Sequence, residues 1–506
     1  MILKMYGWLL ICSISVILIS CKKDDADDPV IPVVKPNIEF YAVNSNNQLL
    51  KYNANAVETP ISNIAITGLQ TGETFLGIDF RPATGELYGF GTTNRLYIIN
   101  LSTGAARMVG TAPVPTGVTG TAAGFNFNPT VDRIRLVYSS GENFRLNPET
   151  AAIAATDGAV NGAANASVTA LAYSGNKAGS AATVLYDIDM VSQKLYRQSP
   201  PNNGTLVEIG SLGVTGITGK AGFDISPDGS VALAALSTAT QNGLYSVDTT
   251  SGKAVALGNF SGPVVTAIAI PTNPVAYAVG ANNALLIFDP SAPATIVSKT
   301  ITGIMPMENI VGIDFRPLNG QLYALGNSSR LYAVNASSGV ATAIGSVPLA
   351  TVLTGTSFGF NFNPTVDRIR VVGNDGQNLR LHPDLGTIAA VDAALNPGTP
   401  SVSGVAYTNN FSGATSTTLF DIDFTTDKLY TQNPPNNGTL VETGALGINV
   451  ESTIGFDIAS RSGTAYAILT SGSSTGLYTI NLSSGAATKL ADFPMPVRGM
   501  TVGLGF

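Results

Sequence analysis

The sequence predicts an all-β protein that folds as two tandem five-bladed β-propellers. A short pattern recurs ten times, at intervals of 41 to 52 residues: an apolar pair, two further strand residues and a small polar residue, followed by a turn and another strand. A period in this range, with about four strands per repeat, is typical of propeller blades. The ten patterns end at Asn53, Asn100, Asn147, Ser199, Asp248, Asp289, Asn335, His382, Asn433 and Asn481.

A larger duplication groups these ten repeats into two sets of five. The segment NFNPTVDRIR at 126–135 recurs at 361–370, and GIDFRP at 77–82 recurs at 312–317. Identity over whole motifs indicates that one five-blade unit was copied once. We therefore expect two closed rings, because a duplicated closed unit can keep its own closure. The alternative is a single ten-bladed ring.

The blade between residues 77 and 109 illustrates how each repeat is read. Strands are predicted at 77–81, 86–91, 95–100 and 105–109, because each segment is short and rich in aromatic or β-branched residues. Gly, Pro, Asn or Thr residues bound these segments, as expected for tight turns.

The polar residue that ends each pattern is predicted to shape a hairpin turn. The Asn100 side chain can accept a hydrogen bond from the backbone two residues later, and Gly104 can adopt a positive φ. His382 occupies the same position in the eighth repeat. We interpret His382 as a turn residue rather than a ligand or catalyst, because its nine equivalents do not titrate near neutral pH.

Each ring should close by pairing strands from its two ends. Segment 264–270 is expected beside 39–43, and 497–504 beside 275–279. Such closure removes the unpaired sheet edge that an open ring would leave. The predicted domains are 38–271 and 272–506.

The composition excludes several kinds of function. The net charge is −7 without a basic cluster, which argues against nucleic acid as a partner. Both cysteines, Cys12 and Cys21, precede the predicted propellers, so these have no disulfide and no cysteine-based zinc site. The one histidine, His382, matches Asn147 in the first copy, which rules out a duplicated histidine-based site.

The N-terminus resembles a bacterial lipoprotein signal peptide covering residues 1–20. Lys4 provides the positive start, and 9–19 form an apolar stretch too short to span a bilayer stably. Ser20 supplies the small residue before Cys21, the predicted lipidation site. The alternative is an ordinary secretory signal with an incidental cysteine.

Residues 21–37 are predicted to form an extended tether rich in Asp, Pro and Val. The stretch CKKDD at 21–25 resembles the start of surface-exported lipoproteins in Bacteroidetes-type bacteria. We therefore expect an outer-membrane lipoprotein of the cell envelope, either surface-exposed or periplasmic. Its contact with the membrane would be the lipid on Cys21.

The repeated motifs resemble one bacterial family, the domain of unknown function 4394. The resemblance rests on GIDFRP, NFNPTVDRIR, QNLRL at 377–381 and PPNNGTL at 200–206, and it covers nearly all of 38–506 as two copies. The first copy departs from this pattern in reading ENFR at 142–145. The resemblance implies an extracytoplasmic location and brings no activity and no catalytic residues.

Polar residues at one shared position of the inner strands form the candidate metal site. Inner strands surround the propeller axis, so these side chains could converge there as oxygen ligands for Ca²⁺. The alternative, which we favour, is that each side chain bonds the backbone of a neighbouring blade, because no complete calcium-loop motif is present. No other cofactor is predicted. The six residues are Asp79, Asn126, Asp224, Asp314, Asn361 and Asp457.

A pair of aspartates could instead indicate glycosidase chemistry. Asp187 and Asp189, repeated as Asp421 and Asp423, are two residues apart and so share one strand face. Such neighbours at a strand end more often cap the following turn. We therefore expect a non-catalytic binding or scaffold module for a protein or glycan. A carbohydrate-active enzyme is the alternative.

Two further motifs are predicted to be structural. The segment DRIR at 132–135 and its copy at 367–370 are expected to form ion pairs at blade edges, and a recognition role for the arginines is the weaker alternative. PPNNG at 200–204 is expected to form a tight turn, because Asn-Gly is a strong hairpin signal.

Overall fold

The computed structural model describes residues 34–111, 113–114, 122–219 and 221–506. Residues Lys35–Phe506 form one compact unit. The signal peptide and most of the tether, Cys21 included, lie outside the described residues. Within the described part of the chain, no helix is long and apolar enough to cross a membrane.

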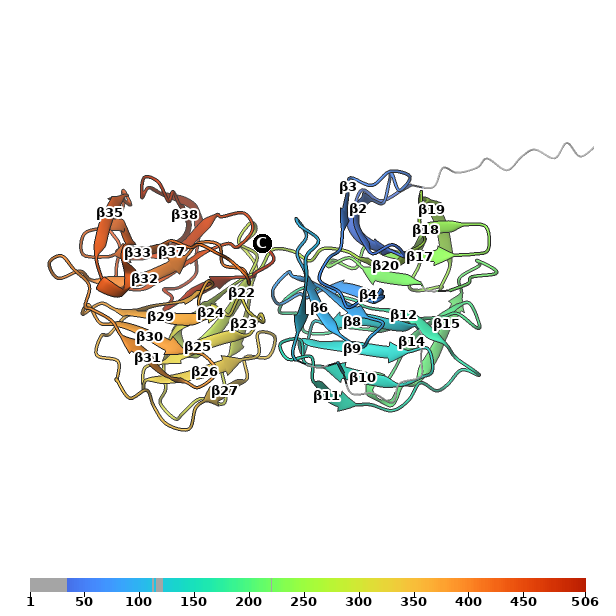
Figure 1. Cartoon of the computed structure of the whole chain (residues 1–506), viewed down its shortest axis with the longest axis horizontal. Helices are drawn as coiled ribbons and strands as arrows, with labels where there is room; N and C mark the ends of the chain where they lie inside the picture. The colour runs from blue at the N-terminus through green and yellow to red at the C-terminus, as the bar shows by residue number, and fades with distance from the viewer. Residues whose placement is uncertain (1–33, 112, 115–121, 220) are drawn as a thin grey trace, which may run out of the picture. The chain divides into compact units, whose positions relative to one another are not determined.

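The first ring contains five four-stranded antiparallel sheets, drawn in blue to green in Figure 1. One sheet has the order β20-β1-β2-β3. Each of the other four sheets consists of four consecutive strands, which begin with β4, β8, β12 and β16. The strands are β1 (Glu39–Asn44), β2 (Gln48–Asn53), β3 (Ser62–Ala65), β4 (Phe75–Phe80), β5 (Leu87–Gly91), β6 (Leu96–Ile99), β7 (Ala106–Val109), β8 (Ala123–Asn128), β9 (Arg133–Tyr138), β10 (Asn143–Leu146), β11 (Ile153–Thr156), β12 (Val168–Tyr173), β13 (Leu185–Asp189), β14 (Lys194–Gln198), β15 (Leu206–Ser211), β16 (Gly222–Ile225), β17 (Ala232–Ser237), β18 (Asn242–Val247), β19 (Ala254–Asn259) and β20 (Val265–Ala269).

The second ring repeats this plan with five more sheets, drawn in yellow to red. Its closing sheet has the order β23-β22-β21-β40. The strands are β21 (Ala276–Val279), β22 (Ala284–Phe288), β23 (Ile296–Thr300), β24 (Ile310–Phe315), β25 (Leu322–Gly326), β26 (Arg330–Val334), β27 (Ala341–Ile344), β28 (Phe358–Asn363), β29 (Arg368–Gly373), β30 (Asn378–His382), β31 (Thr387–Val391), β32 (Val402–Tyr407), β33 (Leu419–Asp423), β34 (Lys428–Gln432), β35 (Leu440–Ala445), β36 (Ile454–Ile458), β37 (Ala465–Ser471), β38 (Ser474–Ile480), β39 (Ala487–Asp492) and β40 (Met500–Val502). Three single-turn 3-10 helices occur in loops: Pro201–Asn203, Ala281–Asn283 and Pro435–Asn437.

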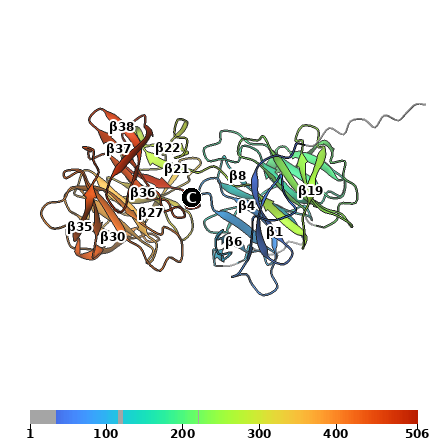
Figure 2. The ribbon, with the colours of Figure 1, turned by 90° about the horizontal axis from the view of Figure 1, so that it is seen from above.

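Contacts between inner strands show that each set of five sheets closes on itself. In the first ring β4 contacts β8, β8 contacts β12, β12 contacts β16, β16 contacts β20, and β20 returns to β4. The same circuit runs through β24, β28, β32, β36 and β40 in the second ring. The chain is therefore two five-bladed propellers, as predicted, and not one ring of ten blades (Figures 1 and 2).

The expected closure strands pair in each ring. Tyr41 of β1 lies opposite Ala269 of β20, and Tyr277 of β21 lies opposite Thr501 of β40. One strand from each end of the repeat thus completes a single sheet, which confirms this part of the sequence prediction. The first strand of each ring, β1 or β21, is therefore paired on both of its edges.

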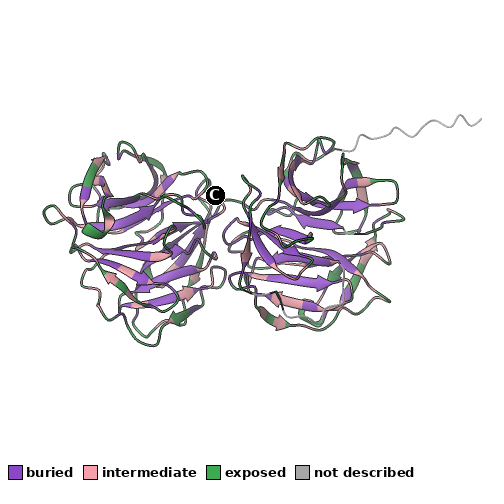
Figure 3. Ribbon diagram, viewed as in Figure 1, coloured by how far each residue is buried: buried purple, intermediate pink, exposed green. Residues whose placement is uncertain are grey.

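Most of the hydrophobic core lies between neighbouring blades. Inner and middle strands are almost wholly buried in Figure 3, whereas outermost strands such as β3 alternate between exposed and half-buried residues. Tyr88 and Phe127, from adjacent blades, pack edge to face with ring centroids 5.1 Å apart. Gly77 permits this close packing, because a Cβ atom there would lie 2.6 Å from Phe125 Cβ. This steric limit explains the glycine of the GIDFRP motif.

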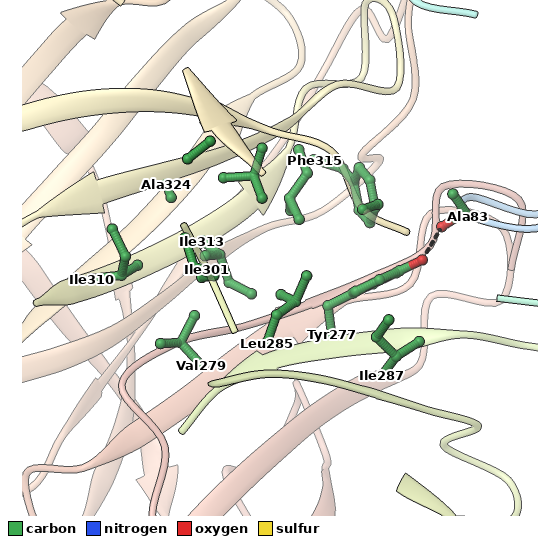
Figure 4. Packing of buried hydrophobic residues seen from close by; sticks show 14 of the residues in the cluster. Ala83, Tyr277, Val279, Leu285, Ile287, Ile301, Ile310, Ile313, Phe315 and Ala324 are labelled. Atoms are coloured by element: carbon green, nitrogen blue, oxygen red, sulfur yellow. Dashed lines mark hydrogen bonds between the residues drawn. The ribbon is translucent and has the colours of Figure 1, made fainter. Parts of the chain in front are cut away.

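One core cluster also receives a residue from the first ring. Ala83 belongs to the same buried cluster as Tyr277, Leu285, Ile313 and Phe315, and it lies beside the hydroxyl end of Tyr277 (Figure 4). The Tyr277 hydroxyl donates a 3.0 Å hydrogen bond to the Ala83 carbonyl. Contacts of this kind join the two rings within the compact unit.

Candidate functional site

The six candidate polar residues occupy inner strands and are completely enclosed. In the first ring Asp79 lies on β4, Asn126 on β8 and Asp224 on β16, and each side chain is at most 1% exposed. The Asn126 Nδ2 atom donates to Asp224 Oδ1 over 3.3 Å. The structure therefore brings these residues together near the axis. They are not the wall of an open pocket.

Each of these side chains also holds the backbone of the next blade. Asp79 Oδ2 accepts the Phe127 N–H at 2.6 Å, and Asn126 Oδ1 accepts the Tyr173 N–H at 2.9 Å. Backbone bonding between blades, the interpretation that the sequence favoured, is thus present in the structure. Asp224 completes the series by accepting the Ile270 N–H at 2.6 Å.

Burial makes the two axial carboxyl groups weak acids. Desolvation raises the pKa of Asp79 well above its usual value, and the nearby Asp224 carboxylate raises it further. Desolvation also raises the pKa of Asp224, to about 7. In the described residues, neither group forms a salt bridge with an arginine or lysine.

The second ring has the same residues with one added hydroxyl. Asn361 Nδ2 donates to Asp457 Oδ1 at 3.2 Å, and Asp314 Oδ2 accepts the Phe362 N–H at 2.7 Å. Thr501 Oγ1 lies 2.8 Å from Asp314 Oδ1 and 3.2 Å from Asp457 Oδ2. It therefore bridges the two carboxyl groups.

A very small cavity lies on the axis of the first ring. Its volume is about 10 Å³, and the inner strands line it one to three residues before the polar side chains. That volume is about what a single water molecule needs. Thr169 lines this cavity with a buried hydroxyl that has no hydrogen-bond partner. Among the described residues, no group of three or more His, Cys, Asp or Glu side chains is placed to hold a metal.

The paired aspartates have two different environments, and both side chains are fully buried. Asp189 caps the turn after β13 by accepting the Val191 and Ser192 backbone N–H groups, at 3.2 and 3.0 Å. Neither carboxyl oxygen of Asp187 has a partner, and desolvation raises the pKa of Asp187 to about 8. Buried groups such as these do not form the accessible carboxylate pair that glycoside hydrolysis requires.

An arginine clamp between blades, which sequence analysis missed, explains why the duplicated motifs DRIR and PPNNG occur together. Arg135 of the DRIR motif donates to Asp157 Oδ2 at 2.6 Å, to Asn143 Oδ1 at 2.7 Å and to Asn202 Oδ1 at 2.8 Å. Asn202 belongs to the PPNNG turn of the next blade, which forms a 3-10 helix ending at left-handed Gly204. The second ring repeats the clamp at Arg370, Asp392, Asn378 and Asn436.

The first residue of the DRIR motif also forms the ion pair expected from sequence. Asp132 accepts two hydrogen bonds from Arg81 of the GIDFRP motif, and Glu149 accepts a third. Asp367 and Arg316 form the matching pair in the second ring. Within the DRIR motif, Arg135 and Arg370 are at most 2% exposed, which favours the structural interpretation over recognition for these two arginines.

His382 lies at the expected turn. Its carbonyl accepts the Gly386 N–H at 3.0 Å, and its buried Nδ1 atom has no partner. At the matching position, Asn147 Oδ1 accepts the Glu149 and Thr150 N–H groups at 2.8 and 2.9 Å. His382 therefore holds the turn through its backbone alone.

A cleft of about 430 Å³ is lined by residues of both rings. Glu86, Arg107, Phe411 and Arg461 are among its lining residues. Burial raises the pKa of Glu86, whereas Arg107 and Arg81 oppose that shift, and the Glu86 Oε2 atom is buried without a partner. The matching residue in the second copy, Gln321, instead donates to two backbone carbonyls.

The family model described as domain of unknown function (DUF4394) matches residues 48–269 and again 284–501. The chain belongs to this family. The two DUF4394 matches coincide with the two rings. No curated protein matches the DUF4394 chain.

Similar solved structures are distant. One is the extracellular domain of a two-component system protein from B. thetaiotaomicron, with 13% identity and a TM-score of 0.25. That match covers 90% of the DUF4394 chain and 59% of the other chain, so the chain spans less than two thirds of that structure's length. Another is the Dos1 propeller, with 13% identity and a TM-score of 0.26, covering 66% of this chain and 86% of that one.

Proposed function

We propose that this protein is a non-catalytic binding module of the cell envelope that recognises a glycan through the cleft around Glu86. The main support for the proposal is the difference in volume between the axial cavity and the cleft. The axial cavity measures about 10 Å³, whereas the cleft measures about 430 Å³. The cleft volume falls in the range typical of small-ligand sites, about 300 to 1,000 Å³.

The lining of the cleft supports a polyhydroxylated ligand. The Glu86 carboxyl can accept hydrogen bonds from hydroxyl groups, and the Arg107 and Arg461 guanidinium groups can only donate. Phe411, 41% exposed, adds an aromatic surface on which a sugar ring can pack. Donors, acceptors and an aromatic face in one cleft match the mixed polarity of a sugar.

The difference between the two copies adds to this argument. Gln321 satisfies the carbonyls of Leu322 and Val334 at 3.0 and 2.8 Å, a role that the acceptor-only carboxylate of Glu86 cannot perform. The first copy therefore lacks a stabilising contact that the second copy keeps. A ligand-binding role for Glu86 accounts for this exchange.

Glycan-array binding with the full chain in detergent tests the proposal. We expect binding to at least one glycan class, and we expect Glu86→Gln and Arg107→Ala to weaken it about tenfold or more, since each loses a charged hydrogen bond. Glu208→Gln, which removes a carboxylate from exposed β15, should bind normally. A folded protein that binds no glycan would overturn the proposal, and so would unchanged binding by Glu86→Gln.

The cellular location forms a separate part of the proposal. We infer that lipid on Cys21 holds the protein to the outer membrane, and that the residues after it act as a tether. The signal-peptide pattern, with Ser20 before Cys21, supports this inference.

A further inference from the structure

The two rings differ at one axial position. In the second ring, Thr501 Oγ1 lies within hydrogen-bonding distance of both Asp314 and Asp457. The same oxygen accepts the Phe315 N–H at 3.3 Å. One protein hydroxyl thus occupies the space between the two buried carboxyl groups.

The first ring has a methyl group at the matching position. Tyr41 pairs with Ala269 as Tyr277 pairs with Thr501, so Ala269 and Thr501 are equivalent. The residue after each confirms the register: Ile270 N–H donates to Asp224 at 2.6 Å, and Val502 N–H donates to Asp457 at 2.7 Å. Alanine has no polar group that could bridge Asp79 and Asp224.

A buried amide lies near one of these two carboxyl groups, that of Asp79. Asn176 is 0% exposed, and neither its Oδ1 nor its Nδ2 atom has a hydrogen-bond partner. Its amide lies close enough to Asp79 to lower the pKa of that carboxyl, without a hydrogen bond of normal geometry. A buried amide with both polar atoms unpaired is costly, and a bound water or ion is one explanation of such a group.

We propose that the first ring binds one Ca²⁺ ion on its axis, between Asp79 and Asp224 and beside Asn176, where the second ring uses the Thr501 hydroxyl. The donors are carboxylate and amide oxygens, which hard cations prefer. Ca²⁺ suits the site better than Mg²⁺, because Ca²⁺ tolerates irregular coordination whereas Mg²⁺ demands a near-ideal octahedron. Binding would displace the protons that these two weak acids otherwise hold, and the ion would balance the resulting negative charges, which have no arginine or lysine partner among the described residues.

The proposal goes beyond glycan recognition and does not depend on it. The three axial polar residues are the same in both rings, whereas the structure assigns the ion to the first ring only. The duplication thus provides an internal control. The threonine of the second ring should abolish the site when placed in the first ring, and the alanine of the first ring should create the site in the second.

Calcium titration of the full chain, stripped with chelator and held at pH 8, tests the proposal. We expect calorimetry to give one Ca²⁺ per wild-type chain, none for Ala269→Thr and two for Thr501→Ala. Saturating Ca²⁺ should raise the Tm of the first ring by several degrees in wild type, because a ligand that binds only the folded state stabilises it. Mg²⁺ at the same concentration should shift it less.

A second variant guards against misfolding of Ala269→Thr. Asn176 lies in a loop, so Asn176→Ala should leave the circular dichroism spectrum unchanged. It should weaken Ca²⁺ binding at least tenfold. A folded wild-type chain that binds no Ca²⁺ at millimolar concentration would overturn the proposal. Equal Ca²⁺ binding by wild type, Ala269→Thr and Asn176→Ala would also overturn it.

Discussion

The Arg135 guanidinium donates to Asn202 Oδ1 over 2.8 Å and so ties one blade of the first ring to the turn of the next. Arg135 is 1% exposed, and its partner carboxylate on Asp157 is almost as well enclosed. The same guanidinium also donates to Asn143 Oδ1 at 2.7 Å. Several buried polar groups therefore depend on one side chain.

We expect Arg135→Ala to lower the free energy of unfolding by about 3 kcal/mol, because it leaves a buried carboxylate with one partner fewer. Denaturant unfolding of the full chain measures this. Arg145→Ala is the matched control, because Arg145 bonds the same Asp157 but is 32% exposed, and it should cost only about 1 kcal/mol. Equal losses for the two variants would contradict the clamp.

Asp187 should make stability depend on pH. Its folded pKa is about 8, against about 3.9 in an unfolded chain, so the folded state holds a proton that the unfolded state has lost between these values. Stability contributed by this site is therefore full below pH 4 and falls as the pH rises toward 8. Asp187→Asn should remove that fall. Its free energy of unfolding, relative to that of wild type, should therefore rise by on the order of 5 kcal/mol between pH 4 and pH 8.

The control for this pH series is Asp228→Asn. Hydrogen bonds from Ser226 and Ser230 lower the pKa of Asp228 to about 2, so its contribution is present above pH 4 and is lost as the pH falls toward 2. Its difference from wild type should stay constant between pH 5 and 8. A constant difference for Asp187→Asn over the same range would argue against a neutral buried Asp187.

His382→Asn should stabilise the second ring. An asparagine there can accept the two backbone N–H groups of the turn, as Asn147 does in the first ring, and each such bond contributes about 1 kcal/mol. The reciprocal Asn147→His should destabilise by a similar amount. Thermal unfolding of both variants measures the pair, and a change of the same sign in both would contradict the turn interpretation.

Cys21→Ala should release the protein from membranes, because the lipid would be its stable hydrophobic attachment. Fractionation of cells expressing the variant measures this, with Cys12→Ala as the control that should remain bound. Retention of Cys21→Ala in the membrane fraction would contradict the lipoprotein proposal.

Periodicity and exact duplication were enough to predict the fold. The two rings, the closure pairing and the ion pairs of the DRIR motif all follow from repeat spacing and residue type. The Arg135 clamp could not be predicted, because its partners Asn143, Asp157 and Asn202 come from separate repeats and meet only after the blades pack. The presence of DRIR and PPNNG in both copies was the available signal.

The axial residues illustrate the same limit at the candidate site. Strand alternation placed Asp79, Asn126 and Asp224 on inner strands, but it could not show that Asn126 reaches Asp224 or that the space between blades is closed. The difference between Ala269 and Thr501 is visible in the sequence. The equivalence of these two positions follows only from the register of the closing sheets, and that register depends on pairing between strands far apart in the sequence.

The closing sheet of the first ring has a mechanical consequence. Strand β1 (Glu39–Asn44) is hydrogen-bonded on both sides, to β2 and to β20, and it is the first strand after the tether. Tension transmitted from a membrane anchor would thus load two hydrogen-bonded ladders at once instead of peeling a single edge strand. The blade that closes the first ring would therefore also be the first blade to be loaded by tension from the membrane anchor.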